Sequence, residues 1–200
     1  MTPLEPLERS EPPEQSGPPK APHLPEPADG IGPTPLGFHH FERRIRLGSG
    51  DGADPAFERG RALLRVWGPQ VGAGIRVEGG EVSPAVGNTA VLHARIGGVL
   101  RMHAPLRVCW TVDVPGRAGF AYETLPGHPE HGRESFVVTR VRDDASGVDD
   151  VWFTVEAYSR PAAWYARLGG PVSRMIQLRY ANKYLLAMAV VRRGRGRRPD

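Results

Sequence analysis

The 200-residue sequence has a single cysteine, Cys109, so the chain can form no internal disulfide and holds no CxxC pair for a metal or redox centre. This cysteine usage is typical of a reducing compartment, and we expect a cytoplasmic protein. Cys109 stands among the apolar residues of a predicted strand, which favours a buried structural thiol over a nucleophile. No apolar run approaches the ~20 residues that a membrane-spanning helix needs, so no transmembrane segment is expected.

Signatures of the common cofactor-binding and catalytic classes are also missing. The glycine-rich segment 48–53 lies between a predicted strand and a predicted helix, but its spacing is not GxGxxG and no GK[ST] follows. Asp51 and Asp54, in or beside this segment, would repel a phosphate. The chain also lacks a nucleophile-elbow sequence. We therefore expect no bound cofactor.

Charge and proline are distributed unevenly along the chain. Residues 1–36 hold eleven of the 21 prolines and six acidic residues against two basic ones, which predicts a disordered leader without the apolar region of a signal peptide. Residues 191–200 hold five arginines and predict a disordered tail of opposite sign. The leader has a net charge of −4 (six acidic and two basic residues) and the tail a net charge of +4 (five basic residues and one acidic residue). Because these two charges cancel, the net charge of +4 of the whole chain belongs to the segment 37–190. This mild charge fits one soluble domain and does not predict a dedicated nucleic-acid binder.

Short apolar segments with alternating polar residues dominate this domain and predict β-strands. The first, from Phe38 to Leu47, is also charged and predicts an edge strand. A helical pattern follows from Asp54, the expected N-cap, to Trp67. Further strands are predicted over 71–77, 89–96, 99–114, 120–125, 136–141 and 151–158. The short connections between them, rich in turn residues, predict an antiparallel meander.

Two of these strands supply large apolar side chains in alternate positions. In the segment 99–114 one face is expected to carry Leu106, Val108, Trp110, Val112 and Val114. In the last strand one face is expected to carry Val151, Phe153, Val155 and Ala157. A sheet with such an apolar face needs another element to cover it.

The periodicity becomes helical near the C-terminus. Ser159 to Pro161 is expected to begin a helical segment carrying Trp164 and Leu168, and Gly169–Pro171 interrupts it. A helix from Pro171 to about Val190 would be roughly 30 Å long, which is enough to cross a whole sheet. Its apolar residues include Val172, Met175, Ile176, Leu178, Leu185 and Leu186. We therefore predict an α+β fold in which a curved antiparallel sheet wraps around the C-terminal helix.

The stretch from Ala118 to Phe136 contains the densest group of titratable side chains. Pro126-Gly127 ends one predicted strand, and the residues up to Phe136 are predicted to form a structured connection. This connection carries His128, Glu130, His131, Arg133 and Glu134. Either these charges belong to an exposed turn, or some of them face the mouth of a pocket together with Tyr122. A metal site from the two histidines and Glu130 has no second cluster to complete it, and no metal is expected.

The order of these elements resembles the helix-grip fold of the START-like superfamily. A narrower resemblance lies in the segment 121–130 (AYETLPGHPE), in Gly132, Glu134 and Phe136, and in the SRP and LGGP sequences at 159–161 and 168–171. Over roughly residues 38–186 the chain is similar to an uncharacterised bacterial and plant family known as domain of unknown function nineteen-ninety. It departs from that family at Glu123, where glycine is usual, and at Arg133, where an acid is common. The resemblance implies a cavity between sheet and helix and no established reaction.

We keep three functions open on these observations. The first is binding of a small apolar or amphipathic molecule between the sheet and the C-terminal helix. The residues expected to contact such a ligand are Trp110, Phe120, Tyr122, His128 and Phe153. A protein with this function would bind its ligand without converting it.

The second function is an enzyme that transfers protons in the same cavity, as a cyclase, hydrolase or isomerase does. His128 would act as general base, Glu130 or Glu134 would orient it, and Tyr122 would donate to an oxyanion. The third is a protein or nucleic-acid interaction domain, which would use Arg107, Arg140, Arg142 and the arginine tail.

Overall fold

A seven-stranded antiparallel sheet, with the strand order β1-β7-β6-β5-β4-β3-β2, is the main element of the computed structural model, which describes residues 29–79, 82–96, 100–162 and 170–194. The strands are β1 (His39–Ser49), β2 (Arg76–Glu78), β3 (Thr89–Ile96), β4 (Leu100–Val114), β5 (Arg117–Thr124), β6 (Glu130–Arg142) and β7 (Asp149–Pro161). Strands β2 to β7 pair in sequence order, which confirms the predicted meander. The first strand, β1, lies at the edge and pairs with the last one, β7.

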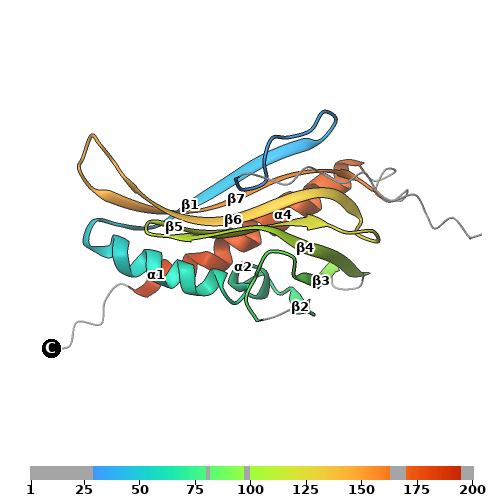
Figure 1. The fold of residues 1–200 in the computed structure, drawn as a ribbon, viewed down its shortest axis with the longest axis horizontal. Helices are drawn as coiled ribbons and strands as arrows, with labels where there is room; N and C mark the ends of the chain where they lie inside the picture. Colours follow the sequence, from blue (N-terminus) through green and yellow to red (C-terminus); the bar gives the residue numbers. More distant parts are fainter. Residues whose placement is uncertain (1–28, 80–81, 97–99, 163–169, 195–200) are drawn as a thin grey trace, which may run out of the picture.

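The helices of the described residues lie along one side of this curved sheet (Figure 1). They are α1 (Ala53–Leu64), α2 (Gly68–Gly72) and α4 (Gly170–Met188), with the 3-10 turns η1 (Gly50–Gly52) and η2 (Ala189–Gly194) at the ends of α1 and α4. Glycines permit close packing at two contacts. A Cβ on Gly60 of α1 would lie 3.1 Å from Val138 of the sheet, and a Cβ on Gly72 of α2 would lie 2.6 Å from the Cβ of Ala187 on α4.

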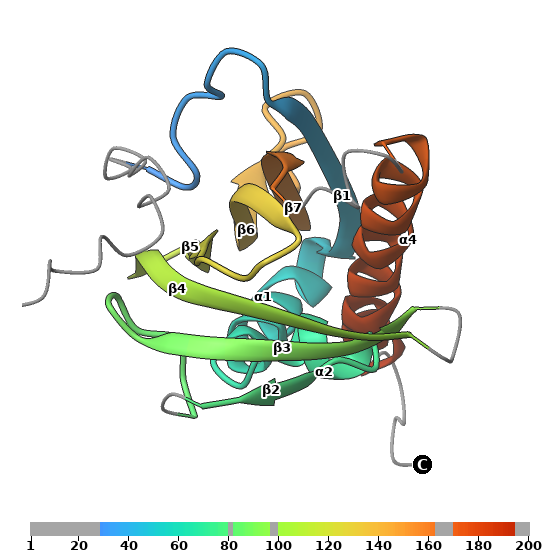
Figure 2. The same cartoon turned by 90° about the vertical axis from the view of Figure 1, so that its right-hand side faces the viewer.

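The long C-terminal helix α4 lies between the two ends of the curved sheet (Figure 2). It contacts β1 and β7 on one side. On the other side, the Tyr180 hydroxyl donates a hydrogen bond of 3.2 Å to the backbone carbonyl of Arg95 in β3. The sheet therefore wraps around the helix, as the predicted helix-grip fold requires. None of the described helices combines the length and the hydropathy that crossing a bilayer requires.

The core lies between the inner face of the sheet and the helices. Four aromatic rings form a continuous series through it, with centroid distances of 5.0 Å (Trp67 to Phe120), 5.3 Å (Phe120 to Phe136) and 5.1 Å (Phe136 to Tyr184). Aromatic pairs at such distances stabilise a core beyond the apolar area that they bury. Trp67, in the turn between α1 and α2, has a left-handed backbone (φ 56°) that this packing holds in place.

A segment before β1 covers part of the opposite, outer face. Ile31 is only 2% exposed and packs with Ala121 and Tyr158. The Phe38 ring lies edge-on to Tyr158 at 5.5 Å, and Asp29 forms an ion pair of 2.7 Å with Arg117. We call residues 29–38 the strap. The expectation of disorder up to residue 36 is therefore wrong for the last part of the leader, because Ile31 has apolar surface to bury.

The other end of the domain also extends past its predicted limit. Val191, assigned to the tail by the sequence, is buried within η2. Its backbone carbonyl accepts a hydrogen bond of 3.1 Å from Arg59 on α1. Residues 195–200 of the predicted tail and residues 1–28 of the leader lie outside the described residues.

A β-bulge in β4 overturns the predicted face of its second half. The pairing with β5 shifts between Val108 and Trp110, so that Trp110 lies opposite Ala121. Because a one-residue shift exchanges the two faces of a strand, Trp110 points to the outer face, where it packs beside the strap. Leu106 and Val108 remain buried on the inner face, as predicted.

Several element boundaries also differ from the sequence-based expectations. Residues 71–77 do not form one strand, because α2 extends to Gly72 and β2 begins at Arg76. Asp54 lies within the first turn of α1 instead of capping it, and its carboxylate pairs with Arg140. Ser159–Pro161 continues β7 instead of starting a helix, and residues 163–169 lie outside the described part of the chain.

Candidate functional site

Three polar side chains meet on the inner face of the sheet, beneath α4. Tyr122 on β5 and Glu134 on β6 are directly opposite each other, and the tyrosine hydroxyl donates a hydrogen bond to Oε2 of Glu134. Tyr184, on α4, lies near enough to this pair to influence the pKa of Tyr122. We call these three residues the Tyr-Glu-Tyr cluster.

Burial controls the electrostatics of this cluster. It raises the pKa of Glu134 to about 7, although the hydrogen bond from Tyr122 acts in the opposite direction. Burial, reinforced by the charge of Glu134, raises the pKa of the Tyr122 and Tyr184 phenols well above their usual range. Both tyrosines therefore stay neutral, while the carboxyl group can gain or lose a proton near neutral pH.

The accessible surface of the cluster belongs mainly to the carboxylate residue. Tyr122 and Tyr184 are 4% and 5% exposed, whereas Glu134 keeps an intermediate exposure. Phe136 packs against both tyrosine rings, at 5.7 Å and 5.1 Å, and closes one side of the cluster. On the other side, the residue of β7 opposite Glu134 is Ala157, which has only a small side chain. The carboxyl group is thus set in apolar surroundings and still has accessible surface.

More polar contacts join the sheet and α4 beyond this cluster. Gln177 on α4 donates a hydrogen bond of 2.5 Å to the Ser159 hydroxyl near the end of β7. The hydroxyl of Thr124 accepts a hydrogen bond of 3.0 Å from the backbone N–H of Gly132, which ties the ends of β5 and β6 together. These contacts fix the end of the sheet from which the Pro126-Gly127 turn projects.

The His128 ring is engaged by its own turn. The backbone N–H of Glu130 donates a hydrogen bond of 2.9 Å to Nδ1 of His128. Burial lowers the pKa of the ring to about 4, so the imidazole is neutral at pH 7. This hydrogen bond holds the turn between β5 and β6, and the structure pairs Glu134 with Tyr122 rather than with His128.

The strand β6 begins earlier than expected, and this separates the other groups of the predicted connection. Because β6 starts at Glu130, its alternation places Glu130 and Glu134 on one face and His131 and Arg133 on the other. His131 lies against the Phe38 ring of the strap, with 5.6 Å between centroids. In the described ranges, no three His, Cys, Asp or Glu side chains are grouped closely enough to hold a metal ion.

The residues predicted to contact a ligand do not all share one face. Phe120, Tyr122 and Phe153 lie in the core on the inner side of the sheet. Trp110 lies on the outer side because of the β4 bulge, so its predicted place in the cavity is wrong. Sequence reasoning also missed Tyr184. The one sequence feature that could have indicated Tyr184 is its spacing from Tyr180, one helical turn away, but this helix carries apolar residues on all sides.

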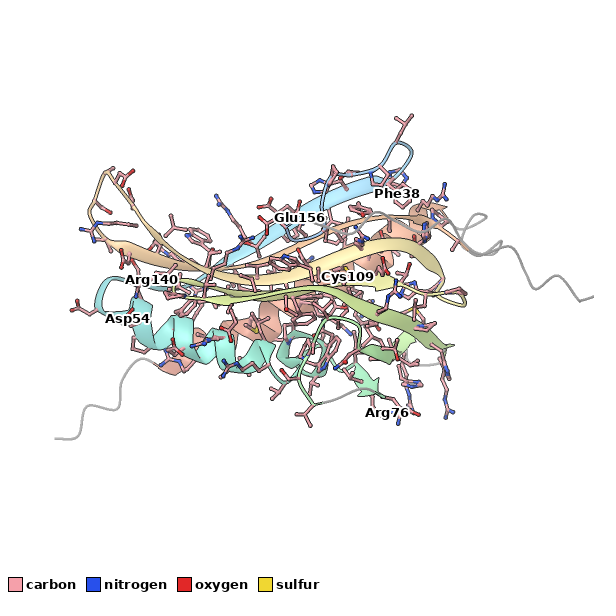
Figure 3. The ribbon with its side chains drawn as sticks, viewed as in Figure 1. Phe38, Asp54, Arg76, Cys109, Arg140 and Glu156 are labelled. Carbon is pink, nitrogen blue, oxygen red and sulfur yellow. The ribbon has the colours of Figure 1, made fainter. Side chains whose placement is uncertain are left out.

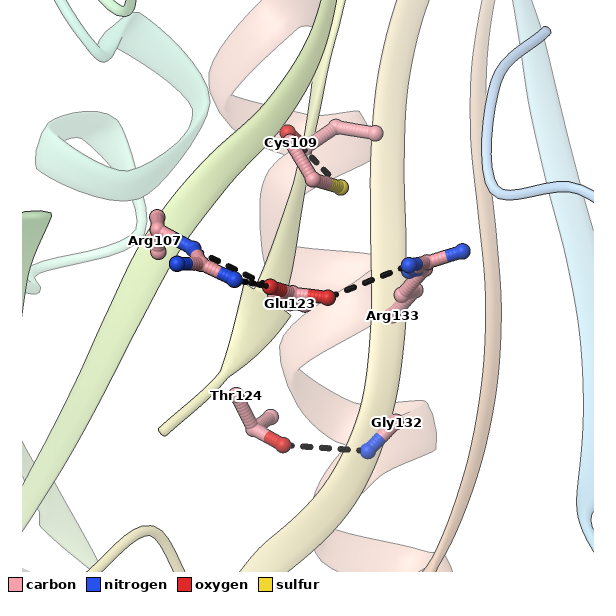
Figure 4. Close-up of polar contacts among 7 residues, drawn as sticks. Arg107, Cys109, Glu123, Thr124, Gly132 and Arg133 are labelled. Carbon is pink, nitrogen blue, oxygen red and sulfur yellow. Dashed lines mark hydrogen bonds and ion pairs between the residues drawn. The ribbon is translucent and has the colours of Figure 1, made fainter. Parts of the chain in front are cut away.

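A second polar network lies on the outer face of the sheet (Figure 4). Glu123 on β5 accepts hydrogen bonds of 3.1 Å from Arg107 on β4 and of 3.1 Å from Arg133 on β6. Burial raises the pKa of Glu123, but the hydrogen bonds and charges of the two arginines outweigh it, and the net pKa is lowered. Glu123 and Arg133 thus form an ion pair with each other.

Cys109 lies beside this network. Its thiol donates a hydrogen bond of 3.6 Å to the carbonyl oxygen of Ala121, and burial raises its pKa to about 11. A thiol with so high a pKa is a poor nucleophile, in agreement with the structural role expected from the sequence.

The arginines considered for an interaction surface are paired with acids of this chain. Arg107 pairs with Glu123, while Arg140 pairs with Asp54 and with Asp149. Arg140 and Asp54 lie at the same end of the molecule (Figure 3). Paired guanidinium groups leave less charge for a phosphate backbone.

A surface groove of about 660 Å³ opens beside α2 and β2. Its apolar wall consists of Val66, Trp67, Val71, Ile75, Val77 and Val82, with Arg76 at its edge. The groove lies away from the Pro126-Gly127 turn, where the sequence led us to expect a pocket mouth. Trp67 connects it to the core, because its ring also packs on Phe120.

Comparison with known proteins places this fold and these residues in context. A UPF0548 protein of Deinococcus radiodurans is 34% identical over 163 residues, which cover 76% of this chain and 78% of that protein. A UPF0548 protein of Dictyostelium discoideum is 31% identical over 102 residues, covering 48% of this chain and 47% of its own length.

Among solved structures, the Zhui aromatase/cyclase from Streptomyces sp. R1128 superposes with a TM-score of 0.51 at 17% identity, over 80% of this chain and 97% of that one. A likeness at that identity concerns the fold alone. The sequence itself matches the family described as "Domain of unknown function (DUF1990)" over residues 25–187. With this match and the identity to the Deinococcus protein, the chain belongs to the DUF1990 family.

Proposed function

We propose that this protein binds a small apolar or amphipathic molecule between its curved sheet and α4, next to the Tyr-Glu-Tyr cluster. The observation that carries the proposal is the position of Glu134. It is a carboxyl group on an apolar inner surface, hydrogen-bonded by a buried tyrosine, and it keeps accessible surface of its own. Ligand sites in proteins combine apolar walls with a few such polar groups.

A purely structural role for Glu134 explains the arrangement less well. A buried carboxyl group destabilises the folded state unless it is fully hydrogen-bonded, and its raised pKa reports this cost. An apolar residue at the same place would pack against Phe136 without that cost. Groups with such perturbed titration occur often at binding and catalytic sites.

Native mass spectrometry of the freshly purified full chain tests the proposal. We expect part of the protein to carry an additional small molecule, which denaturing conditions release. Titration with the neutral fluorescent probe N-phenyl-1-naphthylamine should show saturable binding that the released molecule competes away. Protein free of any adduct that also fails to bind this probe would contradict the proposal.

A pair of variants on β7 locates the binding site. Ala157→Leu adds bulk beside Glu134 on the inner face and should weaken binding of the probe at least about ten-fold. Thr154→Leu adds bulk on the outer face of the same strand and should leave binding unchanged. Equal effects of the two variants would place the probe elsewhere.

A second function, proton transfer on the bound molecule, is favoured by one specific observation. Glu134 has a pKa of about 7, raised by burial, and such a group serves as an acid and as a base at neutral pH. The Glu134 carboxylate would take the proton from the carbon next to a ligand carbonyl, the neighbouring phenols would stabilise the enolate oxygen, and the proton would return. In this scheme Glu134 replaces His128 as the base.

Hydrogen-deuterium exchange measures this activity directly. In D2O the protein should accelerate exchange at the carbon next to the carbonyl of 2-tetralone, as followed by NMR. Glu134→Gln should abolish the acceleration while the ketone still binds. Exchange at the same rate with and without the protein would exclude this second function and leave the binding proposal intact.

A further inference from the structure

We propose that the Tyr-Glu-Tyr cluster selects ligands that carry a neutral hydroxyl group, a phenol or an alcohol, and rejects ligands that carry a carboxylate. This inference rests on the proposed binding function and names the chemistry of the group that the site recognises. It follows from the hydrogen bonds, from the charges around the cluster and from its apolar walls.

The hydrogen-bonding capacity of the cluster is only partly used. The Tyr122 hydroxyl donates a hydrogen bond to Oε2 of Glu134. A carboxyl group has a second oxygen, Oε1, and no described hydrogen bond or ion pair of the cluster engages it. Since Glu134 keeps accessible surface, Oε1 is the atom that a ligand group would meet.

A hydroxyl group matches this atom in both of its protonation states. When Glu134 is ionised, Oε1 only accepts, and a ligand hydroxyl can donate to it. When Glu134 is protonated, the carboxyl proton can be donated to the oxygen of the same hydroxyl. A ligand carbonyl only accepts, so it can form a hydrogen bond with Glu134 itself only when the carboxyl group is protonated.

The charges around the cluster disfavour an anionic ligand. The titratable groups that act on Glu134 are Tyr122 from β5 and, through it, Tyr184 from α4, and both phenols are neutral. The strand on the other side, β7, presents Ala157 opposite Glu134. No hydrogen bond or ion pair among the described residues joins Glu134 to a cationic side chain, and its hydrogen-bond partner is Tyr122. A ligand carboxylate would therefore be buried against a second carboxyl group without a counter-charge.

Four naphthalene probes of nearly the same size test the inference on the full chain. They are 2-naphthol, 2-acetonaphthone, 2-naphthoate and 2-methylnaphthalene, and their dissociation constants can be measured by fluorescence titration. At pH 7 we expect 2-naphthol to bind at least about ten-fold more tightly than 2-methylnaphthalene and 2-naphthoate, the gain typical of a hydrogen bond to a charged group. At pH 8.5 binding of 2-acetonaphthone should weaken, while binding of 2-naphthol should persist.

Substitutions at Glu134 separate the two parts of the inference. Glu134→Leu should remove the preference for 2-naphthol over 2-methylnaphthalene, because the hydrogen-bonding group is gone. Glu134→Gln should keep that preference and admit 2-naphthoate, because it removes only the charge. Tyr180→Phe, one turn away on α4 and bonded to Arg95, is the matched control and should change none of the four dissociation constants.

The outcomes distinguish this inference from the function on which it rests. If none of the four probes binds, the proposed function itself fails. If all four bind equally to the parent protein, or if Glu134→Leu leaves their ratios unchanged, the hydroxyl preference is wrong and the binding function stands. Tightest binding by 2-naphthoate would also overturn the inference. Thermal unfolding of each variant verifies that a lost preference does not come from a lost fold.

Discussion

Tyr122 and Glu134 lie opposite each other on β5 and β6 and are joined by a hydrogen bond on the inner face of the sheet. The next pair of the same two strands, Glu123 and Arg133, is joined by an ion pair on the outer face. Two adjacent residue pairs of the sheet therefore contain carboxyl groups whose pKa values are shifted in opposite directions. Burial raises the pKa of Glu134, whereas two arginines lower that of Glu123 against the effect of its own burial.

The Glu134 carboxyl group should make the stability of the protein fall as the pH rises. Its pKa is about 7 in the folded protein, raised by burial from 4.5, so its stabilising contribution is complete below pH 4.5 and is lost as the pH rises through about 7. Glu134→Gln should remove this loss and raise the free energy of unfolding by up to about 3 kcal/mol at pH 8. Urea unfolding at pH 4.5 and pH 8 measures the difference. A gain of the same size at both pH values would contradict the assigned titration.

His128 should have the opposite effect to Glu134 and make the stability of the protein fall as the pH is lowered. Burial lowers its pKa from 6.5 to about 4, so its contribution to stability is complete above pH 6.5 and is lost as the pH falls through about 4. His128→Asn keeps an acceptor for the Glu130 N–H and does not titrate. Its unfolding free energy should therefore decline less steeply than that of the parent, by up to about 1.4 kcal/mol per pH unit in this window. Parallel stability curves for the two proteins would show that the ring does not titrate as described.

Gly132 should tolerate no side chain. A Cβ at this position would lie 2.0 Å from the carbonyl oxygen of Tyr158 and 2.7 Å from the Cα of Ser159, both backbone atoms of β7. Gly132→Ala should therefore force β6 and β7 apart and cost at least about 2 kcal/mol of stability. Gly30→Ala is a suitable comparison, because its Cβ would meet nothing within 4 Å and only its φ of +52° would be strained, at about 1 kcal/mol. Denaturation midpoints that do not separate the two variants would refute the steric argument.

The strap should contribute to stability through a single anchor. Ile31→Ala removes a side chain that is 2% exposed and should cost about 2 to 4 kcal/mol. Leu36→Ala, in the same segment but fully exposed at 102%, should change stability by less than about 0.5 kcal/mol. Urea unfolding, followed through tryptophan emission because Trp110 packs beside the strap, measures both. An equal effect of the two substitutions would mean that the strap is not anchored at Ile31.

Alternation in the sequence predicted most of the sheet, because each strand has one face against the core. The strand 89–96 agrees with the structure residue for residue, whereas the helix predicted up to Trp67 ends three residues earlier, at Leu64. The bulge before Trp110 could not be predicted, since one extra residue in a strand leaves no mark in the apolar pattern. The candidate site was predicted only in part, because Tyr122 and Glu134 were expected at the same pocket but their mutual hydrogen bond was not.

Tyr184 was not predicted as part of the site because the sequence of α4 does not show which side of the helix is buried. Its apolar residues lie on several sides, and the sequence singled out Met175 and Leu186, which are exposed in the structure. The buried side is instead marked by Ala181, Tyr184 and Met188, three or four residues apart. Only the curvature of the sheet decides which side of such a helix is covered. Tyr184 could therefore be placed beside Glu134 only once the three-dimensional arrangement was known.

The pairing of β1 with β7 has a consequence for how the chain is made. His40 of β1 is hydrogen-bonded to Glu156 of β7, 116 positions further along the chain, and β7 is the only strand beside β1 in the part of the chain that the structure describes. During synthesis β1 therefore stays without its partner strand until β7 has also left the ribosome. Closing so long a loop is slow, so we expect completion of the edge to be a late event in folding.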